Sequence, residues 1–129
     1  MLGYATIGTN DLKSALAFYD ALLAEVGAKR LMETPHGFTM YGVTLRKPAL
    51  AITPPYNGKP ASPGNGNMLA LALEARAFVD SVYKKALELG GSDEGAPGVR
   101  GEEGPQAFYA AYFRDPEGNK LCVYKVGPG

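Results

Sequence analysis

Few side chains in this sequence have the types and spacing that chemistry requires. The chain carries one histidine, His36, in a Pro-His-Gly turn, and one cysteine, Cys122, in an apolar run. A site for zinc or a similar metal needs several imidazole, thiolate or carboxylate ligands together, so these two residues supply little material for one. His36 fits an exposed turn residue, or else a general base or ligand from a partner chain. Cys122 fits a buried inert thiol, or a reactive thiol if a cation lies beside it.

Arg100 is a candidate for binding rather than for metal chemistry. It follows a Gly-Ala-Pro-Gly stretch and precedes an aromatic run. A guanidinium there could hold a carboxylate or phosphate through two parallel hydrogen bonds, and the alternative is a solvated loop arginine. Tyr109 lies in that aromatic run, where an inward-facing tyrosine would add an apolar surface with a hydroxyl group. No nucleophile elbow or phosphate-binding loop is present in the sequence.

Composition and charge exclude several classes of partner. The chain of 129 residues has the length of one domain, and its 13 basic residues balance 13 acidic ones. This balance leaves no electrostatic footprint for nucleic acid. The sequence has no basic amphipathic helix and no apolar run long enough to cross a membrane. A single cysteine excludes an intrachain disulfide and the N-terminus does not resemble a signal peptide, so we expect a cytoplasmic protein.

A hairpin near the C-terminus is the clearest structural element. The run Ala107–Tyr124 reads as two aromatic and apolar strands joined by a tight turn. Asp115, Pro116 and Gly118 stand where a type I turn prefers these residue types. Gly118 can then adopt a positive φ and lead into the second strand.

The two halves of the chain share one order of elements. The first half reads as a strand at Leu2–Gly8, a helix from Leu12 that stops at Gly27, and strands at Ala28–Glu33, Phe38–Val43 and Pro48–Thr53. The second half reads as a strand at Asn67–Leu73, a helix at Ala75–Leu89, a polar stretch at Ser92–Gly104 with at most one short strand, and the hairpin. The sequence therefore predicts an α+β fold of two βαβββ modules, residues 1–54 and 67–127, joined by a linker at 55–66 within a single domain, 1–129. An unrelated α+β meander is the alternative.

Strand alternation predicts which residues face a cavity. Leu69 and Leu71 claim the helix-facing side of their strand, which turns Ala70 to the other side, and a one-residue shift would exchange the two sets. We expect the two sheets to form a half-barrel around a cleft, where a ligand would bind. The predicted cavity residues are Tyr4, Thr6, Ala51, Met68, Ala70, Arg100, Tyr109 and Cys122.

The paired βαβββ order, the opening IGTNDLKSALAFYDALLAEVGA and the closing FYAAYFRDPEGNKL resemble the vicinal oxygen chelate superfamily, also called glyoxalase/bleomycin-resistance/dioxygenase. The resemblance covers essentially the whole chain. It implies a cytoplasmic fold, often dimeric, with a cavity that in many members holds a divalent metal. Metal-dependent members typically carry His, Gln or Glu at four inward strand positions. These positions match Tyr4, Ala51, Met68 and Cys122 in this sequence.

None of these four residues is the expected ligand, because a phenol, a methyl, a thioether and one thiol do not form a zinc, nickel or manganese site. We therefore expect a homodimeric member without a metal or other cofactor, which binds a small organic molecule in its cavity. No catalytic residue is identified. The alternative is a glyoxalase-like lyase or isomerase with ligands from shifted positions such as Glu33, His36 or Glu74, or a metal-free proton-transfer enzyme built on tyrosines. A structural or partner-binding module is the third possibility.

Overall fold

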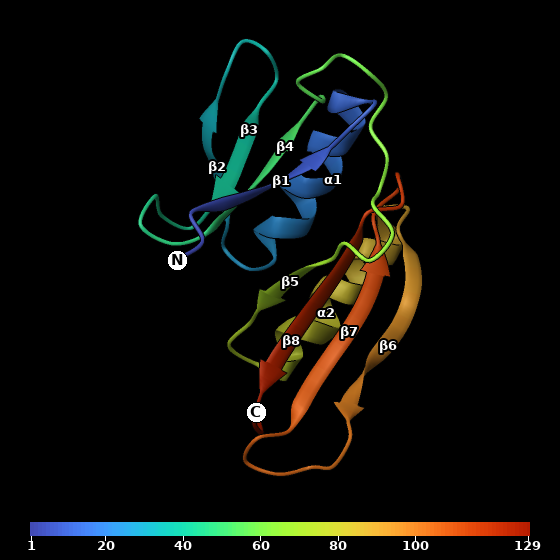
Figure 1. Cartoon of the computed structure of the whole chain (residues 1–129). Coiled ribbons are helices and arrows are strands. Elements are labelled where there is room, and N and C mark those ends of the chain that lie inside the picture. The colour runs from blue at the N-terminus through green and yellow to red at the C-terminus, as the bar shows by residue number, and fades with distance from the viewer. The chain divides into compact units, whose positions relative to one another are not determined.

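The computed structural model describes residues 1–129, and the chain divides into two compact units, Met1–Pro63 and Gly64–Gly129. The first unit contains β1 (Tyr4–Gly8), α1 (Leu12–Ala24), β2 (Lys29–Glu33), β3 (Thr39–Gly42) and β4 (Ala49–Thr53) (Figure 1). The second unit contains β5 (Leu69–Ala72), α2 (Arg76–Glu88), β6 (Ser92–Arg100), β7 (Phe108–Arg114) and β8 (Lys120–Val126). The predicted pair of βαβββ modules is confirmed. The division between the units falls inside the segment predicted as a linker.

Each module forms its own four-stranded mixed sheet. The strand order is β1-β4-β3-β2 in the first module and β5-β8-β7-β6 in the second. In both, the first strand pairs in parallel with the last strand, and the remaining pairs are antiparallel. The two sheets thus have the same order and the same directions, as expected for a duplicated module.

Helix α1 begins and ends where the sequence signals it. The carboxylate of Asp11 accepts hydrogen bonds from Ser14 N at 3.1 Å and from Ser14 Oγ at 2.8 Å, and this caps the first turn. Gly27 follows the helix with a φ of 76°, a conformation that glycine adopts without strain. Between them, helical spacing gathers the buried side chains Phe18, Tyr19, Leu22 and Leu23 on one stripe. Neither helix is long and apolar enough to span a membrane.

The strands alternate as predicted. In β1, Ile7 is buried while Tyr4 and Thr6 are exposed. In β5, the leucines are half-buried and the alanines are exposed. Because one face of each strand is apolar, the register cannot slip by one residue without exposing that face.

Strand β6 is longer than the sequence predicted. It runs for nine residues, although the stretch is polar and rich in glycine. Its pairing with β7 shifts between Asp93 and Gly95 and again between Gly95 and Gly98. These irregularities accommodate the glycines, because bulges are where strands tolerate them.

The hairpin between β7 and β8 has the predicted turn. Gly118 N donates to Asp115 O at 2.9 Å, and Gly118 has a φ of 92°. The Asp115 carboxylate also accepts from the backbone N–H groups of Glu117 and Asn119, both at 2.9 Å. The turn therefore fixes the register of the longest strand pair in the second module.

Candidate functional site

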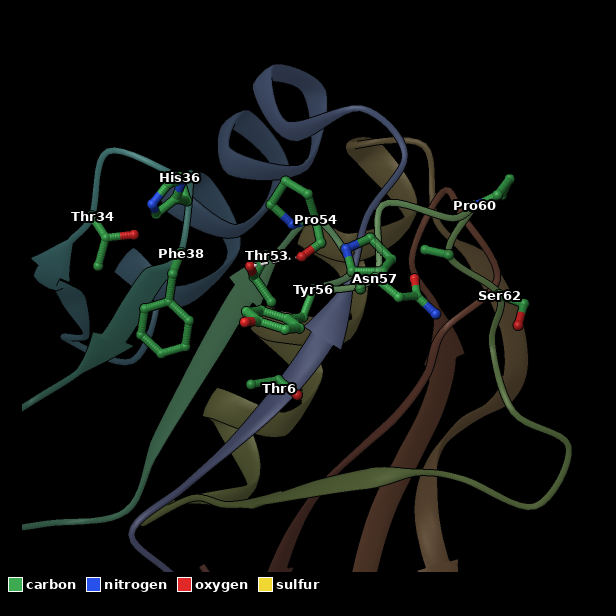
Figure 2. Close-up of a pocket in the computed structure, with 13 residues that line it drawn as sticks. Thr6, Thr34, His36, Phe38, Thr53, Pro54, Tyr56, Asn57, Pro60 and Ser62 are labelled. Carbon is green, nitrogen blue, oxygen red and sulfur yellow. Dashed lines mark hydrogen bonds between the residues drawn. The ribbon is translucent and has the colours of Figure 1, made fainter.

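A cleft of about 1170 Å³ opens in the first module. Three segments line it, as Figure 2 shows: strand β1, the turn between β2 and β3, and the end of β4 with the chain that follows it. The side chains used below are Thr6, Thr34, His36, Phe38, Thr53 and Tyr56.

The turn between β2 and β3 brings three lining residues to the cleft. Phe38 accepts a hydrogen bond at its carbonyl from Thr34 N at 2.9 Å, and Gly37 N donates to Thr34 O at 3.0 Å. Gly37 has a φ of 96°, and a Cβ there would lie 2.6 Å from a methyl of Leu12. A tight turn with a glycine at this position is therefore needed to hold His36 and Phe38 beside the sheet.

The segment after β4 is held against the first module by one asparagine. Asn10 Nδ2 donates to Ala61 O at 3.0 Å, and Ala61 N donates to Asn10 Oδ1 at 2.7 Å. Gly8 allows this approach, since a Cβ there would lie 3.1 Å from Ala61 Cβ. Residues expected to serve only as a linker thus form one side of the cleft.

The cleft combines apolar rings with neutral polar groups. Phe38, Tyr56 and the neighbouring prolines provide flat apolar surface, and Thr6, Thr34 and Thr53 provide hydroxyls that both donate and accept. No Asp, Glu, Lys or Arg is among the lining residues. His36 supplies the one imidazole among the lining side chains. Such a surface can bind an uncharged ring and one or two polar groups.

The three cavity residues predicted in the first module lie on one sheet face. Thr6 lines the cleft and pairs with Ala51 in the β1–β4 ladder. Ala51 is fully buried. The Tyr4 ring packs edge-on against the ring of Phe38, with centroids 5.7 Å apart. Tyr4, Thr6 and Ala51 therefore share this face, as strand alternation predicted, and Thr53, a lining residue that was not predicted, shares it with Ala51.

Two of the cavity residues predicted in the second module, Ala70 and Cys122, are neighbours on adjacent strands. Ala70 pairs with Cys122 across β5 and β8, and Cys122 pairs with Tyr112 across β8 and β7. Met68 directly precedes β5 and is exposed. Burial raises the pKa of the Cys122 thiol, and a hydrogen bond with Tyr112 offsets only part of this effect. Cys122 is therefore a protonated, buried thiol at neutral pH.

Tyr109 does not face the predicted cavity. Its hydroxyl donates to Asp80 of α2 at 2.6 Å, and the guanidinium of Arg76 lies over its ring at 4.9 Å. The hydrogen bond to Asp80 raises the pKa of Tyr109. Side chains alternate along β7, so Tyr109 lies on the helix side and Tyr112 lies on the side of Cys122. The expectation that Tyr109 points inward is corrected by this geometry.

Four positions of this chain match the metal-ligand positions of the superfamily that the sequence resembles. The side chains at these positions are not suited to bind a divalent metal. Tyr4, Ala51 and Met68 offer a phenol, a methyl and a thioether, and Cys122 offers a thiol whose pKa is raised. No three His, Cys, Asp or Glu side chains in residues 1–129 come together as a metal-binding group. Glu33, one of the shifted candidates, pairs instead with Arg30 at 2.9 Å.

Comparison with known proteins identifies the fold. Residues 1–123 match the family model described as the Glyoxalase/Bleomycin resistance protein/Dioxygenase superfamily. None of the curated proteins matches the sequence. Among solved structures, a glyoxalase/bleomycin resistance protein from Albidiferax ferrireducens is 33% identical, with a TM-score of 0.84 over 97% of this chain and 98% of that one.

Two further structures share the fold at lower identity. A glyoxalase-related enzyme from Fulvimarina pelagi is 20% identical, with a TM-score of 0.71 over 97% of this chain and 87% of that one. A lactoylglutathione lyase from Agrobacterium tumefaciens is 19% identical, with a TM-score of 0.65 over 97% and 92%. The family match over nearly the whole chain agrees with the duplicated βαβββ modules. The chain belongs to the glyoxalase/bleomycin resistance protein/dioxygenase superfamily.

Proposed function

We propose that this chain is a ligand-binding member of the superfamily, which holds a small, uncharged, partly apolar organic molecule in the first-module cleft without a metal. The observation that carries the proposal is the lining of the cleft: aromatic rings, prolines and threonine hydroxyls, with no acidic or strongly basic side chain. Ligand sites in proteins are typically apolar surfaces with a few placed polar groups, and this lining has that character.

The charge of the ligand follows from the same lining. A charged group that leaves water needs a counter-charge or several hydrogen bonds, or its desolvation opposes binding. The cleft offers hydroxyls and one imidazole, but no carboxylate, ammonium or guanidinium group. An uncharged ligand therefore fits it better than an acid or an amine.

A flat ring is the apolar group that would pack best in this cleft. Phe38 and Tyr56 present ring faces or edges to the cleft (Figure 2). The Tyr56 side chain is fully exposed, so a ligand ring that covers it would remove apolar surface from water. Thr6 or Thr53 would then bond a carbonyl or amide group on the ring.

A second candidate function, a lyase or isomerase that moves a proton, is favoured by the position of His36 in the cleft. A metal-dependent form of this enzyme lacks a cluster of ligands in the chain. Turnover of the hemithioacetal of glutathione, measured with and without added nickel or zinc, separates this candidate from binding alone. Activity that His36→Gln abolishes would favour the enzyme.

We also propose that the protein is a cytoplasmic homodimer, as the superfamily resemblance implies. The open sheet faces that carry Tyr4 in the first module and Ala70 in the second give each module apolar surface to cover. Sedimentation velocity at micromolar concentration tests the dimer, and a purely monomeric result would exclude it.

The binding proposal is tested by a site-resolved titration. Benzamide, benzoate and benzylamine share one ring and differ in charge, so backbone amide shifts in nuclear magnetic resonance report both which ligand binds and where. We expect benzamide to shift the amides of β1 and of the turn at 34–38, with weaker effects from the two charged ligands. Elemental analysis of protein purified without chelator should show no stoichiometric divalent metal.

Two phenylalanine variants locate the site. Thr6→Phe fills the cleft and should abolish benzamide binding, whereas Thr44→Phe makes the same change on an exposed loop and should leave binding intact. Ala70→Phe tests whether the second module contributes to the same site, as the sequence predicted. Benzamide binding that survives Thr6→Phe, or a metal retained at one per chain, would refute the proposal.

A further inference from the structure

We propose that the second module carries a binding site for the oxyanion of a small organic acid, formed by Arg100 and Lys120 around the ring of Tyr112. We call these three residues the Tyr112 cluster. This inference does not rest on the cleft of the first module, because it involves other residues and a ligand of opposite character.

Arg100 is held in place by its own strand. Arg100 Nη1 donates to Gly98 O and Nη2 donates to Ala96 O, both at 2.8 Å. Its Cζ lies 5.4 Å from the centroid of the Tyr112 ring, within the range of a cation–π contact. Both hydrogen-bond partners are neutral carbonyls, so they orient the guanidinium and leave its charge without a carboxylate.

The irregular course of β6 makes this arrangement possible. A Cβ on Gly95 would lie 3.1 Å from Arg100 Nη2, and one on Gly98 would lie 3.5 Å from Nη1. The two shifts in register occur at these same glycines. Bulges commonly re-aim a strand near functional sites, and here they turn two carbonyls toward one guanidinium.

Lys120 places a second cation near the ring of Tyr112. Its Nζ lies 5.6 Å from the centroid of the Tyr112 ring, and it forms no ion pair. The neighbouring Arg114, which pairs with Lys120 across the hairpin, is already neutralised by Glu94 at 2.6 Å. Two partly buried cations thus remain without a counter-charge, and an anion would supply it.

The residues beside the Tyr112 cluster suit the organic part of such a ligand. Ala70, Cys122 and Tyr112 form one row across β5, β8 and β7, in which the buried Cys122 lies between the exposed Ala70 and the half-buried Tyr112. Tyr124 and Phe108 stack with their ring centroids 5.1 Å apart on the neighbouring strands. A ring or short alkyl chain could therefore contact apolar atoms while its oxyanion meets Arg100 and Lys120.

The site is tested by titrating the full chain with benzoate, phenyl phosphate and benzamide, and by following the backbone amide shifts of β7 and β8. The shifts of these amides give a dissociation constant for each ligand. We expect benzoate or phenyl phosphate to bind at least about tenfold more tightly than benzamide, and its affinity to fall as the salt concentration is raised. A preference for either oxyanion supports the site and identifies the group that it takes.

Matched variants make the result decisive. Lys120→Met and Arg100→Met should each weaken oxyanion binding about tenfold or more, and Lys84→Met, on the exposed side of α2, should not. Lys120→Met leaves the contacts of Arg100 with β6 intact, so it remains informative if Arg100→Met disturbs folding. Equal affinity for benzoate and benzamide at β7 and β8, or unchanged benzoate binding in Lys120→Met, would overturn the proposal. Thr6→Phe fills the first-module cleft but should leave benzoate binding at β7 and β8 unchanged. A failure of the Tyr112 cluster to bind benzoate can therefore be told from a failure of the first-module cleft to bind benzamide.

Discussion

The substitution Tyr41→Phe tests how the first module holds its helix on its sheet. The side chain of Tyr41 is almost fully buried, and its hydroxyl donates to Asp20 Oδ1 of α1 at 2.7 Å. Asp20 is bound in turn by Arg30 of β2, whose Nε and Nη2 donate to it at 2.8 and 2.7 Å. One oxygen atom thus links β3 to an ion pair that joins the helix to another strand.

The expected cost follows from the charge and the exposure of Asp20. A hydrogen bond to a charged group contributes about 1.5–3 kcal/mol in proteins. Asp20 keeps 43% of its side chain exposed, so water can replace the lost phenol. We therefore expect Tyr41→Phe to lower the free energy of unfolding by about 1–2 kcal/mol, near the lower end of that range. Urea denaturation followed by circular dichroism measures it.

The pH dependence adds a second readout. Hydrogen bonds from Arg30, and to a lesser extent from Tyr41, lower the pKa of Asp20, and burial opposes them. A carboxyl whose pKa is lowered on folding stabilises the fold above its unfolded pKa, and this contribution is lost as the pH falls through its folded pKa. The difference between wild type and Tyr41→Phe should therefore be full at neutral pH and should shrink below about pH 4.

Tyr56→Phe is the matched control, because its hydroxyl lies on a fully exposed side chain. It should change stability by less than about 0.5 kcal/mol. A loss for Tyr41→Phe at neutral pH no larger than that of this control would show that the hydrogen bond to Asp20 contributes nothing to stability.

Three further substitutions probe the second module. Glu103→Gln should destabilise the protein at neutral pH but not near pH 2, because the hydrogen bonds from Arg76 lower the pKa of Glu103 to about 2; thermal unfolding at several pH values checks this. Asp115→Ala should cost about 2–4 kcal/mol in urea denaturation, since the buried carboxylate accepts three hydrogen bonds from its turn, and a loss below 1 kcal/mol would contradict this. Gly91→Ala should cost about 1–3 kcal/mol, because the new Cβ would lie 2.6 Å from Arg114 O, whereas Gly3→Ala meets no atom within 4 Å and should be neutral.

The sequence was sufficient for the module order and for the faces of β1 and β5. In β1 the more buried set is Ala5 and Ile7, and in β5 large leucines alternate with small alanines, so packing against the core favours a single register. Strand β7 carries aromatic residues on both faces, and the pattern there does not say which tyrosine faces α2. The pairing of Tyr112 with Cys122, together with a spacing of three residues, excludes Tyr109 from that face.

Two features depend on contacts that the local sequence does not show. The length of β6 could not be predicted because its glycines and proline are typical of loops. Pairing with β7 overrides this local preference for a loop. The segment after β4 lacks any periodicity, and its hydrogen bonds with Asn10, which is 51 positions away from Ala61, hold it at the side of the cleft. Thr34, His36 and Phe38 likewise become neighbours of Thr6 through the sheet and not through the sequence.

A crystal structure of the protein soaked with both benzamide and zinc chloride, with anomalous scattering measured at the zinc edge, tests whether the first-module cleft binds an uncharged ring without a metal. We expect benzamide to lie against Phe38 and Tyr56, with its amide within hydrogen-bonding distance of Thr6 or Thr53. We expect no zinc at Tyr4, Ala51, Met68 or Cys122. Zinc bound at any of these positions, or benzamide that binds elsewhere and leaves the first-module cleft free, would contradict the proposed metal-free binding.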